Sequence, residues 1–343
     1  DFTTDVVTGG VFNRNMIAVA DDGAIFMANL PTNTTSSPFK IYRWENESAA
    51  APTLVYSGSP LADARMGDTF DVIGSGVDTR IVAGYGATSA TGDNSFAIFD
   101  TTDGLNFTAT HVNIAGMPPS DGDFRLGITF KDEDTVYGTQ GPFVREVDVS
   151  GGTGTLVNSF ITDGASLRPM DFAMIDGRPI LAIQEASPAQ DAIARARIFV
   201  YDLSLGLADE QLADRKIAEA SALPAGQVQQ RNVNGTGQVR FGEIDGLTAI
   251  IYGLSTNNGI QAFELTLDPQ SADNADFDGS MLVDGGDFLT WQQNFEISDG
   301  TAVRADGDAT GEGNVNGDDL GVWGSLYGSN PNGAATLRRR ALC

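Results

Sequence analysis

The residues best suited to chemistry are the acids near the C-terminal end of the chain. Residues 271–320 contain twelve Asp or Glu and one basic residue, Arg304. The acids recur with an offset of 32 positions, which aligns Asp276 with Asp308 and Asp287 with Asp319. Ca²⁺ is bound by oxygen ligands at positions 1, 3, 5, 7, 9 and 12 of a 12-residue loop. The spacing therefore predicts two calcium-binding loops.

Each predicted loop would use five side chains and, at position 7, a backbone carbonyl. The first set is Asp276, Asp278, Ser280, the Leu282 carbonyl, Asp284 and Asp287. The second set is Asp308, Thr310, Glu312, the Asn314 carbonyl, Asn316 and Asp319.

Neither loop is ideal. Met281 occupies position 6, where glycine is expected, and a non-glycine residue held at positive φ costs roughly 1–2 kcal/mol. Ser280 and Thr310 are neutral ligands. We therefore expect two weak Ca²⁺ sites, suited to the calcium concentrations outside cells. The alternative is a pair of Asp/Gly-rich linkers that bind no metal.

The repeat continues beyond the loops. At the same offset Phe288 matches Leu320, Trp291 matches Trp323 and Phe295 matches Tyr327. Apolar residues at these spacings form one face of a short helix. Each loop is therefore expected to lead into a helix.

Paired loop–helix repeats without an entering helix resemble a type I dockerin, an EF-hand-like module. The style of Asp276–Trp291 and Ala305–Trp323 is similar to the dockerin-like C-termini of secreted planctomycete proteins. Gly10–Val19 and Ser37–Trp44 resemble an uncharacterised secreted propeller-like family found with such modules.

The resemblance implies a secreted or cell-surface protein whose residues 276–328 dock onto a cohesin-like or cell-surface partner, or onto another copy of the chain. Cellulosomal dockerins often carry Ser-Thr at loop positions 10 and 11. This chain has Gly285-Gly286 and Gly317-Asp318 there, which argues against a cellulosome-type cohesin but not against the calcium fold.

The rest of the chain must form the scaffold, and its pattern is that of an all-β protein. From Val6 to Leu267, short β-branched and aromatic runs alternate with Gly, Asp and Asn. Hairpin turns near positions 22, 77, 133, 176 and 245 are each followed by a further strand, at spacings typical of propeller blades. The prediction is a mainly β fold with five visible blade-like units. An incomplete larger ring and a β-sandwich stay open as alternatives.

The predicted domain boundaries follow from these patterns. Residues 1–268 form the propeller-like domain, 269–275 a linker, 276–328 the small α-helical dockerin-like module and 329–343 a tail. The stretch Leu207–Leu223, rich in Ala, Glu and Lys, is expected to be a helix inserted between blades.

No catalytic residue is assigned. His111 lies in a strand-like run, and no Gly-x-Ser-x-Gly elbow occurs in the sequence. Most of the acids nearest the hairpins are better explained as turn formers; these acids are Asp22, Asp68, Asp71, Asp78, Asp171 and Asp245. Thr102–Thr108 resembles the structural Asp-box turn of sialidase-like propellers.

Composition excludes several classes of function. A net charge of −26 over 343 residues disfavours nucleic acid as a partner. One Cys permits neither an intrachain disulfide nor a Cys-rich zinc site, and one His excludes a multi-His metal site. No run approaches the ~20 apolar residues of a membrane span. Because the chain begins at Asp1, we expect either a removed leader or a fragment.

Three functions are compatible with these features. The first is a secreted, non-enzymatic binding or scaffold protein joined to a calcium-stabilised docking module. The second is a carbohydrate-active propeller enzyme, a glycosidase or lyase tethered in polysaccharide degradation. The third is a structural subunit of an extracellular filament or layer. The first is favoured because no catalytic constellation is visible in residues 1–268.

Overall fold

The computed structural model describes most of the chain. The ranges outside the described residues are 1–3, 87–95, 116, 118–123, 163–166, 187–196, 206–210, 222–227, 229, 233–234, 270–272, 281, 332–334 and 342–343.

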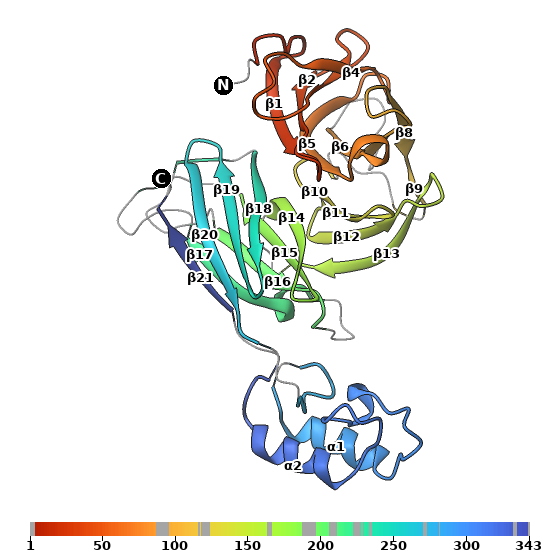
Figure 1. Cartoon of the computed structure of the whole chain (residues 1–343), viewed down its shortest axis with the longest axis vertical. Helices are drawn as coiled ribbons and strands as arrows, with labels where there is room; N and C mark the ends of the chain where they lie inside the picture. Colours follow the sequence, from red (N-terminus) through yellow and green to blue (C-terminus); the bar gives the residue numbers. More distant parts are fainter. Residues whose placement is uncertain are drawn as a thin grey trace.

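The described strands form five antiparallel blades around a common axis (Figure 1). Blade 1 contains β1 (Phe12–Val19), β2 (Ile25–Leu30), β3 (Phe39–Trp44) and β4 (Thr53–Gly58). Blade 2 contains β5 (Arg65–Ile73), β6 (Arg80–Gly86), β7 (Phe96–Thr101) and β8 (Phe107–Val112). Blade 3 contains β10 (Ile128–Asp132), β11 (Thr135–Gln140), β12 (Phe143–Asp148) and β13 (Gly154–Ile161), with β9 (Ile114–Ala115) parallel to β13. Blade 4 contains β14 (Leu167–Ile175), β15 (Arg178–Glu185), β16 (Arg197–Asp202) and β17 (Lys216–Ser221). Blade 5 contains β18 (Gly237–Asp245), β19 (Thr248–Ser255), β20 (Gly259–Leu267) and β21 (Ala335–Arg340).

This arrangement confirms the prediction of a mainly β, five-bladed propeller. Every expected inner hairpin is present, and its turn chemistry explains why. Between β14 and β15, for example, Asp176 and Gly177 have φ of 51° and 74°. Asp and Gly tolerate positive φ, and this tight turn matches the twist of the two strands. The turn sets the register in which Ile175 faces Arg178.

Apolar side chains join successive blades. One cluster spans blades 1 and 2, a second blades 2 and 3, a third blades 3 and 4, and a fourth blades 4 and 5. Strands in the middle of a blade are covered on both faces, so all six residues of β2 are buried. Outer strands such as β4 are more exposed, and only one of the six residues of β4, Val55, is buried.

The seam between blades 5 and 1 is different, because none of the apolar clusters of the described residues spans it. A hydrogen bond joins the two inner strands there: the Gln238 side chain donates to the Ile17 carbonyl at 2.5 Å. A cavity of about 320 Å³ lies beside this contact. The inner strands at this seam are therefore joined by a polar contact that lies beside a cavity.

Blade 5 is completed by a strand that the sequence pattern does not reveal. β21 pairs antiparallel with β20, in a register that places Leu267 opposite Ala335. Residues 335–340 thus belong to the propeller and not to a tail. The helical segment between β20 and β21, called here the helical module (residues 273–331), is an insertion within blade 5. Figure 1 shows it below the propeller, joined by two adjacent chain segments.

The predicted helix over Leu207–Leu223 is wrong within the described residues. A short 3-10 turn (η2, Ala213–Arg215) leads into β17, which pairs with β16. Ala, Glu and Lys favour helices, but their propensities differ by less than about 1 kcal/mol per residue. Pairing with β16 and packing of Ile217 and Ala220 against the cluster between blades 4 and 5 outweigh that preference.

The helical module contains α1 (Gly285–Asn294), α2 (Gly317–Leu326) and a 3-10 turn η3 (Arg304–Asp306). Its core is separate from those of the propeller and includes Val283, Trp291 and Val315. None of the helices in the described residues combines the length and apolar character that crossing a membrane requires.

Removing β21 should destabilise the propeller. A chain that ends at Pro331 leaves β20 as an exposed edge and uncovers the site of Leu337, which packs against the cluster between blades 4 and 5. Burying a leucine is worth roughly 1.5–3 kcal/mol, so we expect a loss of about 2 kcal/mol in the free energy of unfolding. Urea denaturation measures it. A chain ending at Arg340 is the control and should keep its stability; equal stability of both truncations would contradict the role of β21.

Candidate metal centre and propeller axis

The helical module is built from two copies of one hydrogen-bonded unit. Asp284 caps α1 and Asn316 caps α2, each side chain accepting from the backbone N–H two residues later at 2.6 Å. Asp287 and Asp319 complete the capping boxes by accepting from the N–H of the cap residue at 2.8 Å. Such reciprocal pairs satisfy N–H groups that the first helical turn leaves unpaired. The 32-residue repeat thus corresponds to two copies of the same N-terminal helix cap.

The two units also hold each other. The indole N–H of Trp291 donates to the Asn316 carbonyl at 2.7 Å, and that of Trp323 donates to the Asp284 carbonyl at 2.9 Å. Val283 exchanges backbone hydrogen bonds with residues 328 and 329, as Val315 does with residues 296 and 297. Each loop is therefore fixed by the chain that follows the other repeat's helix.

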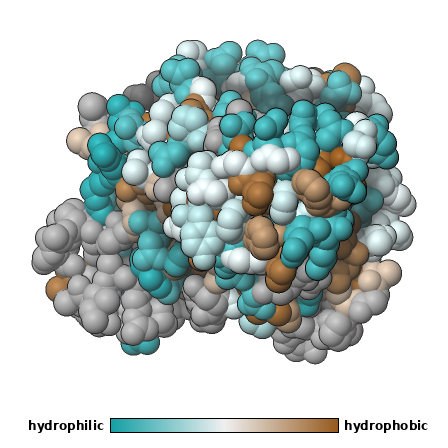
Figure 2. Space-filling model, turned by 90° about the horizontal axis from the view of Figure 1, so that it is seen from below, coloured by the Kyte–Doolittle hydropathy of each residue, from teal (hydrophilic) through white to brown (hydrophobic). Residues whose placement is uncertain are grey.

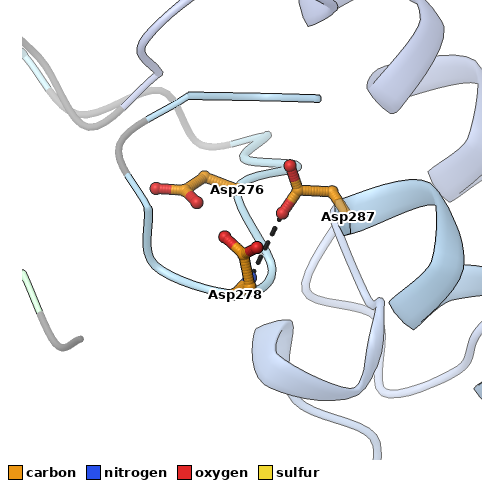
Figure 3. Close-up of side chains that lie close together, drawn as sticks. All are labelled: Asp276, Asp278 and Asp287. Atoms are coloured by element: carbon orange, nitrogen blue, oxygen red, sulfur yellow. Dashed lines mark hydrogen bonds between the residues drawn. The ribbon is translucent and has the colours of Figure 1, made fainter. Parts of the chain in front are cut away.

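The first loop brings three of its predicted ligands together. Carboxylate oxygens of Asp276, Asp278 and Asp287 lie within 4.8 Å of one another. Figure 3 shows Asp278 between the other two, with its N–H bonded to Asp287. Asp276 and Asp287 are buried and Asp278 is exposed. A cavity of about 330 Å³ is lined in part by Asp276 and Asp278.

The other predicted ligands of this loop are placed less directly. The Ser280 hydroxyl donates to the Leu282 carbonyl at 3.1 Å, so these two oxygens are adjacent. Asp284 uses its side chain to cap α1. Met281, where strain was expected, lies outside the described residues.

The second loop does not gather its acids in the same way, since Asp308, Glu312 and Asp319 do not form a three-carboxylate group like that of the first loop. Asp308 instead accepts backbone N–H groups from Gly311, Glu312 and Gly313. The hydroxyl of Thr310 bonds to Asp308 and Asp319, and Glu312 bonds to the Asn316 amide. Among the described residues, no hydrogen bond places the Asn314 carbonyl. Within the described residues, the three-carboxylate cluster is therefore found in the first loop and not in the second.

The chemistry of the first site fits a hard divalent cation. All its donors are oxygens, which is the preference of Ca²⁺ and Mg²⁺. Burial raises the pKa of Asp287, and the nearby charge of Asp278 adds to that rise, while three backbone N–H bonds oppose it. Three carboxylates this close repel one another unless a cation lies between them. A Ca²⁺ ion would be held by Asp276, Asp278 and Asp287.

The propeller axis is filled by a network of charged side chains. Arg240 of β18 pairs with Asp71 of β5 and Asp171 of β14, each at 3.1 Å. The Thr129 hydroxyl of β10 donates to Asp71 at 2.9 Å. Asp171 also accepts from the Phe241 N–H at 2.6 Å. Four inner strands are thereby joined at one point.

This network corrects part of the turn-former prediction. Asp71 and Asp171 lie inside the inner strands and are buried, as is Asp68. Side chains alternate between the two faces of a strand, and these acids occupy positions that face the axis. An acid that only forms a turn would not need to be buried. The space beside Arg240 measures about 10 Å³, room for about one water molecule. Among the described residues, the side chains at this depth form an ion and hydrogen-bond network that joins the inner strands.

Two other motifs of the propeller have structural surroundings. His111 lies on β8 with its Nδ1 3.3 Å from the Tyr85 hydroxyl. In the turn before β8, Asp103 accepts the N–H groups of Leu105 and Asn106, and these bonds, with one from the Asn106 side chain, hold its pKa well below its ordinary value. Phe107 is buried against Phe26. The Asp-box-like turn thus supports the hairpin.

No family model and no curated protein matches the sequence. Among solved structures, a DUF4623 family protein from Bacteroides eggerthii is similar with a TM-score of 0.59 and 18% identity. The match covers 78% of this chain and 62% of that protein, so the chain spans less than two thirds of its length. Aleuria aurantia lectin, in complex with α-methyl-L-fucoside, has a TM-score of 0.46 and 10% identity, over 77% of this chain and 78% of the lectin. At 18% identity the likeness to the DUF4623 family protein shows a shared fold alone.

Stability should depend on the protonation of Asp171. Burial is the main cause that raises its pKa from 3.8 to about 6, with the charge of Asp71 adding to the rise and Arg240 opposing it. An acid whose pKa is raised by folding favours the native state below that pKa, so its contribution falls as pH rises from about 4 to about 7. At about 1.4 kcal/mol per pKa unit, the change is up to about 3 kcal/mol.

The Asp171→Asn variant should lack this dependence. The unfolding free energy of the wild type minus that of the variant, measured in urea, is expected to fall by up to about 3 kcal/mol between pH 4 and pH 7. Asp176→Asn, in the exposed turn after β14, should follow the wild type at every pH. A parallel pH profile for wild type and Asp171→Asn would contradict the assignment.

Proposed function

We propose that the chain is a secreted or cell-surface, non-enzymatic binding protein in which a calcium-stabilised, dockerin-like module docks the propeller to a partner. The observation that carries the proposal is the gathering of Asp276, Asp278 and Asp287 in a loop whose spacing suits calcium. In this account Ca²⁺ offsets the repulsion among the three carboxylates and fixes the start of α1.

The docking face is assigned to the helices and the residues that end them. Leu289, Phe295 and Tyr327 are 54%, 46% and 60% exposed, although all three are large and apolar. Phe295 and Tyr327 are matching positions of the two repeats, so the exposed residues occur in both halves. Figure 2 views the molecule from the side of the module and shows apolar side chains among polar ones on that face. A docking face on this module would use these residues, because interaction sites are built from exposed apolar patches.

The partner we propose is a cohesin-like or cell-surface protein. Association with a second copy of the chain, as in an extracellular layer, is the competing arrangement. Sedimentation of the purified chain with calcium distinguishes them, because only the second predicts self-association.

Calcium binding tests the proposal. Titrating the full chain with CaCl₂ should change tryptophan fluorescence, since Trp291 and Trp323 bond to the loops. The midpoint should lie at about 10⁻⁴–10⁻³ M. Asp278→Asn should weaken binding about ten-fold or more, because it removes one of three ligand charges while keeping the side-chain shape.

Asp299→Asn is the matched control: it removes an equal charge at an exposed position of the same module outside both loops. It should titrate like the wild type. No fluorescence or heat signal up to about 10 mM CaCl₂, or equal weakening by both variants, would refute the calcium site.

A further inference from the structure

The cavity of about 320 Å³ at the seam between blades 5 and 1 is called here the seam cavity. Its wall draws on three blades, with Phe12 and Asn15 from β1, Arg65 from β5 and Gln238 from β18. Its volume falls at the lower end of the range of small-molecule sites. None of the apolar clusters of the described residues spans this seam, so a ligand here would join blades that those clusters do not join.

The charged groups in the wall of the seam cavity are paired with each other. Arg65 binds both carboxylate oxygens of Asp68, at 2.6 and 2.7 Å. Asp68 is buried and also accepts from Arg125 at 2.7 Å. Such charge-assisted pairs occupy the carboxylate, and the described residues of the wall contain no other charged side chain. The ligand that suits this cavity is therefore neutral.

Three neutral side chains of the wall keep unused hydrogen-bonding capacity. Asn15 and Gln238 each donate an amide N–H to a backbone carbonyl at 2.5 Å. No hydrogen bond among the described residues uses their side-chain oxygens, so these remain acceptors. The Thr256 hydroxyl accepts from Thr236 at 2.8 Å and keeps its own hydrogen to donate. A purely apolar ligand would cover these groups without giving them partners, at a cost in free energy.

The rest of the wall is apolar. Phe12 is 54% exposed and Leu254 is 38% exposed, and the buried side chains of Met16 and Leu30 lie beside them in the lining. A ligand with an apolar face and polar edges would match both parts of the wall. A sugar ring has this character, because its C–H face packs on the electron-rich face of an aromatic ring while its hydroxyls point outward.

We propose that the seam cavity binds a neutral sugar ring, with its C–H face against Phe12 and its hydroxyls bonded to Gln238 and Thr256. The inference rests on the binding role proposed above for the propeller, and it names the class of ligand. Both sides of the seam contribute, since Phe12 belongs to blade 1 and Gln238 to blade 5.

Isothermal titration of the full chain with the methyl α-D-glycosides of glucose, galactose and mannose tests this directly. At the efficiency usual for small ligands, we expect saturable binding of at least one of them with a Kd of about 1 mM. Methyl α-D-glucuronide should bind no more tightly than the glucoside, because the charges of the wall are already paired. Cyclohexanol, a ring with one hydroxyl, should bind at least about ten-fold more weakly than the best glycoside.

Two wall variants and two matched controls locate the binding. Phe12→Ala and Thr256→Val should each weaken binding of the best glycoside about five-fold, because each removes one contact with the sugar. Phe295→Ala removes an exposed phenylalanine of the helical module, and Thr248→Val removes a hydroxyl at the other end of β19. Both controls should bind the glycoside like the wild type.

The inference is overturned if none of the three glycosides binds at concentrations up to about 50 mM. Tighter binding of the glucuronide, equal binding of cyclohexanol, or equal losses in the wall variants and their controls would overturn it as well. Calcium titration reports on the helical module alone, so the sugar site and the calcium site can fail independently.

Discussion

The structure depends on the pairing of β20 with β21 across an inserted module. Leu267 and Ala335 are neighbours in the sheet although 67 residues separate them in the chain. The helical module must therefore leave and rejoin the propeller at adjacent points. Its internal repeat meets this demand, since Val283 near its start bonds to residues 328 and 329 near its end. The buried Arg178–Asp202 pair adds an anchor, because Arg178 also donates to the Asp268 carbonyl.

The acids that would bind the proposed metal include one, Asp287, that also stabilises the fold of the helical module. Asp287 closes a capping box on α1 by accepting the Asp284 N–H, and it ties that helix to residues 277 and 278 by accepting their two backbone N–H groups. This position also buries its charge close to two other carboxylates. Folding of α1 thus creates an electrostatic cost that a divalent cation would offset. Calcium, in this account, stabilises the connection between the two halves of blade 5 as well as a docking surface.

Local patterns made most of the propeller predictable. Hairpins such as Asp176-Gly177 combine turn chemistry with strands on either side, and the 32-residue offset predicted that each loop leads into a helix. Non-local contacts escaped prediction. β17 forms from residues with helical propensity because it pairs with the edge of β16. β21 pairs with β20 although the whole helical module lies between them in the sequence. The positions of Asp71 and Asp171 near hairpins predicted turn formers. Their partner, Arg240, comes from another blade and meets them only in the closed ring. Such pairing edges and the partners at the propeller axis form only when the blades assemble, so a local sequence pattern does not predict them.

Hydrogen exchange of the full chain, with calcium and with a chelator, tests the central claim most directly. If calcium binds the first loop and the module links β20 to β21, calcium should slow exchange at residues 276–287 and also at residues 259–267 and 335–340. Amides of β2 in blade 1 should exchange at the same rate in both conditions. Identical exchange throughout the module and blade 5 with and without calcium would contradict the account.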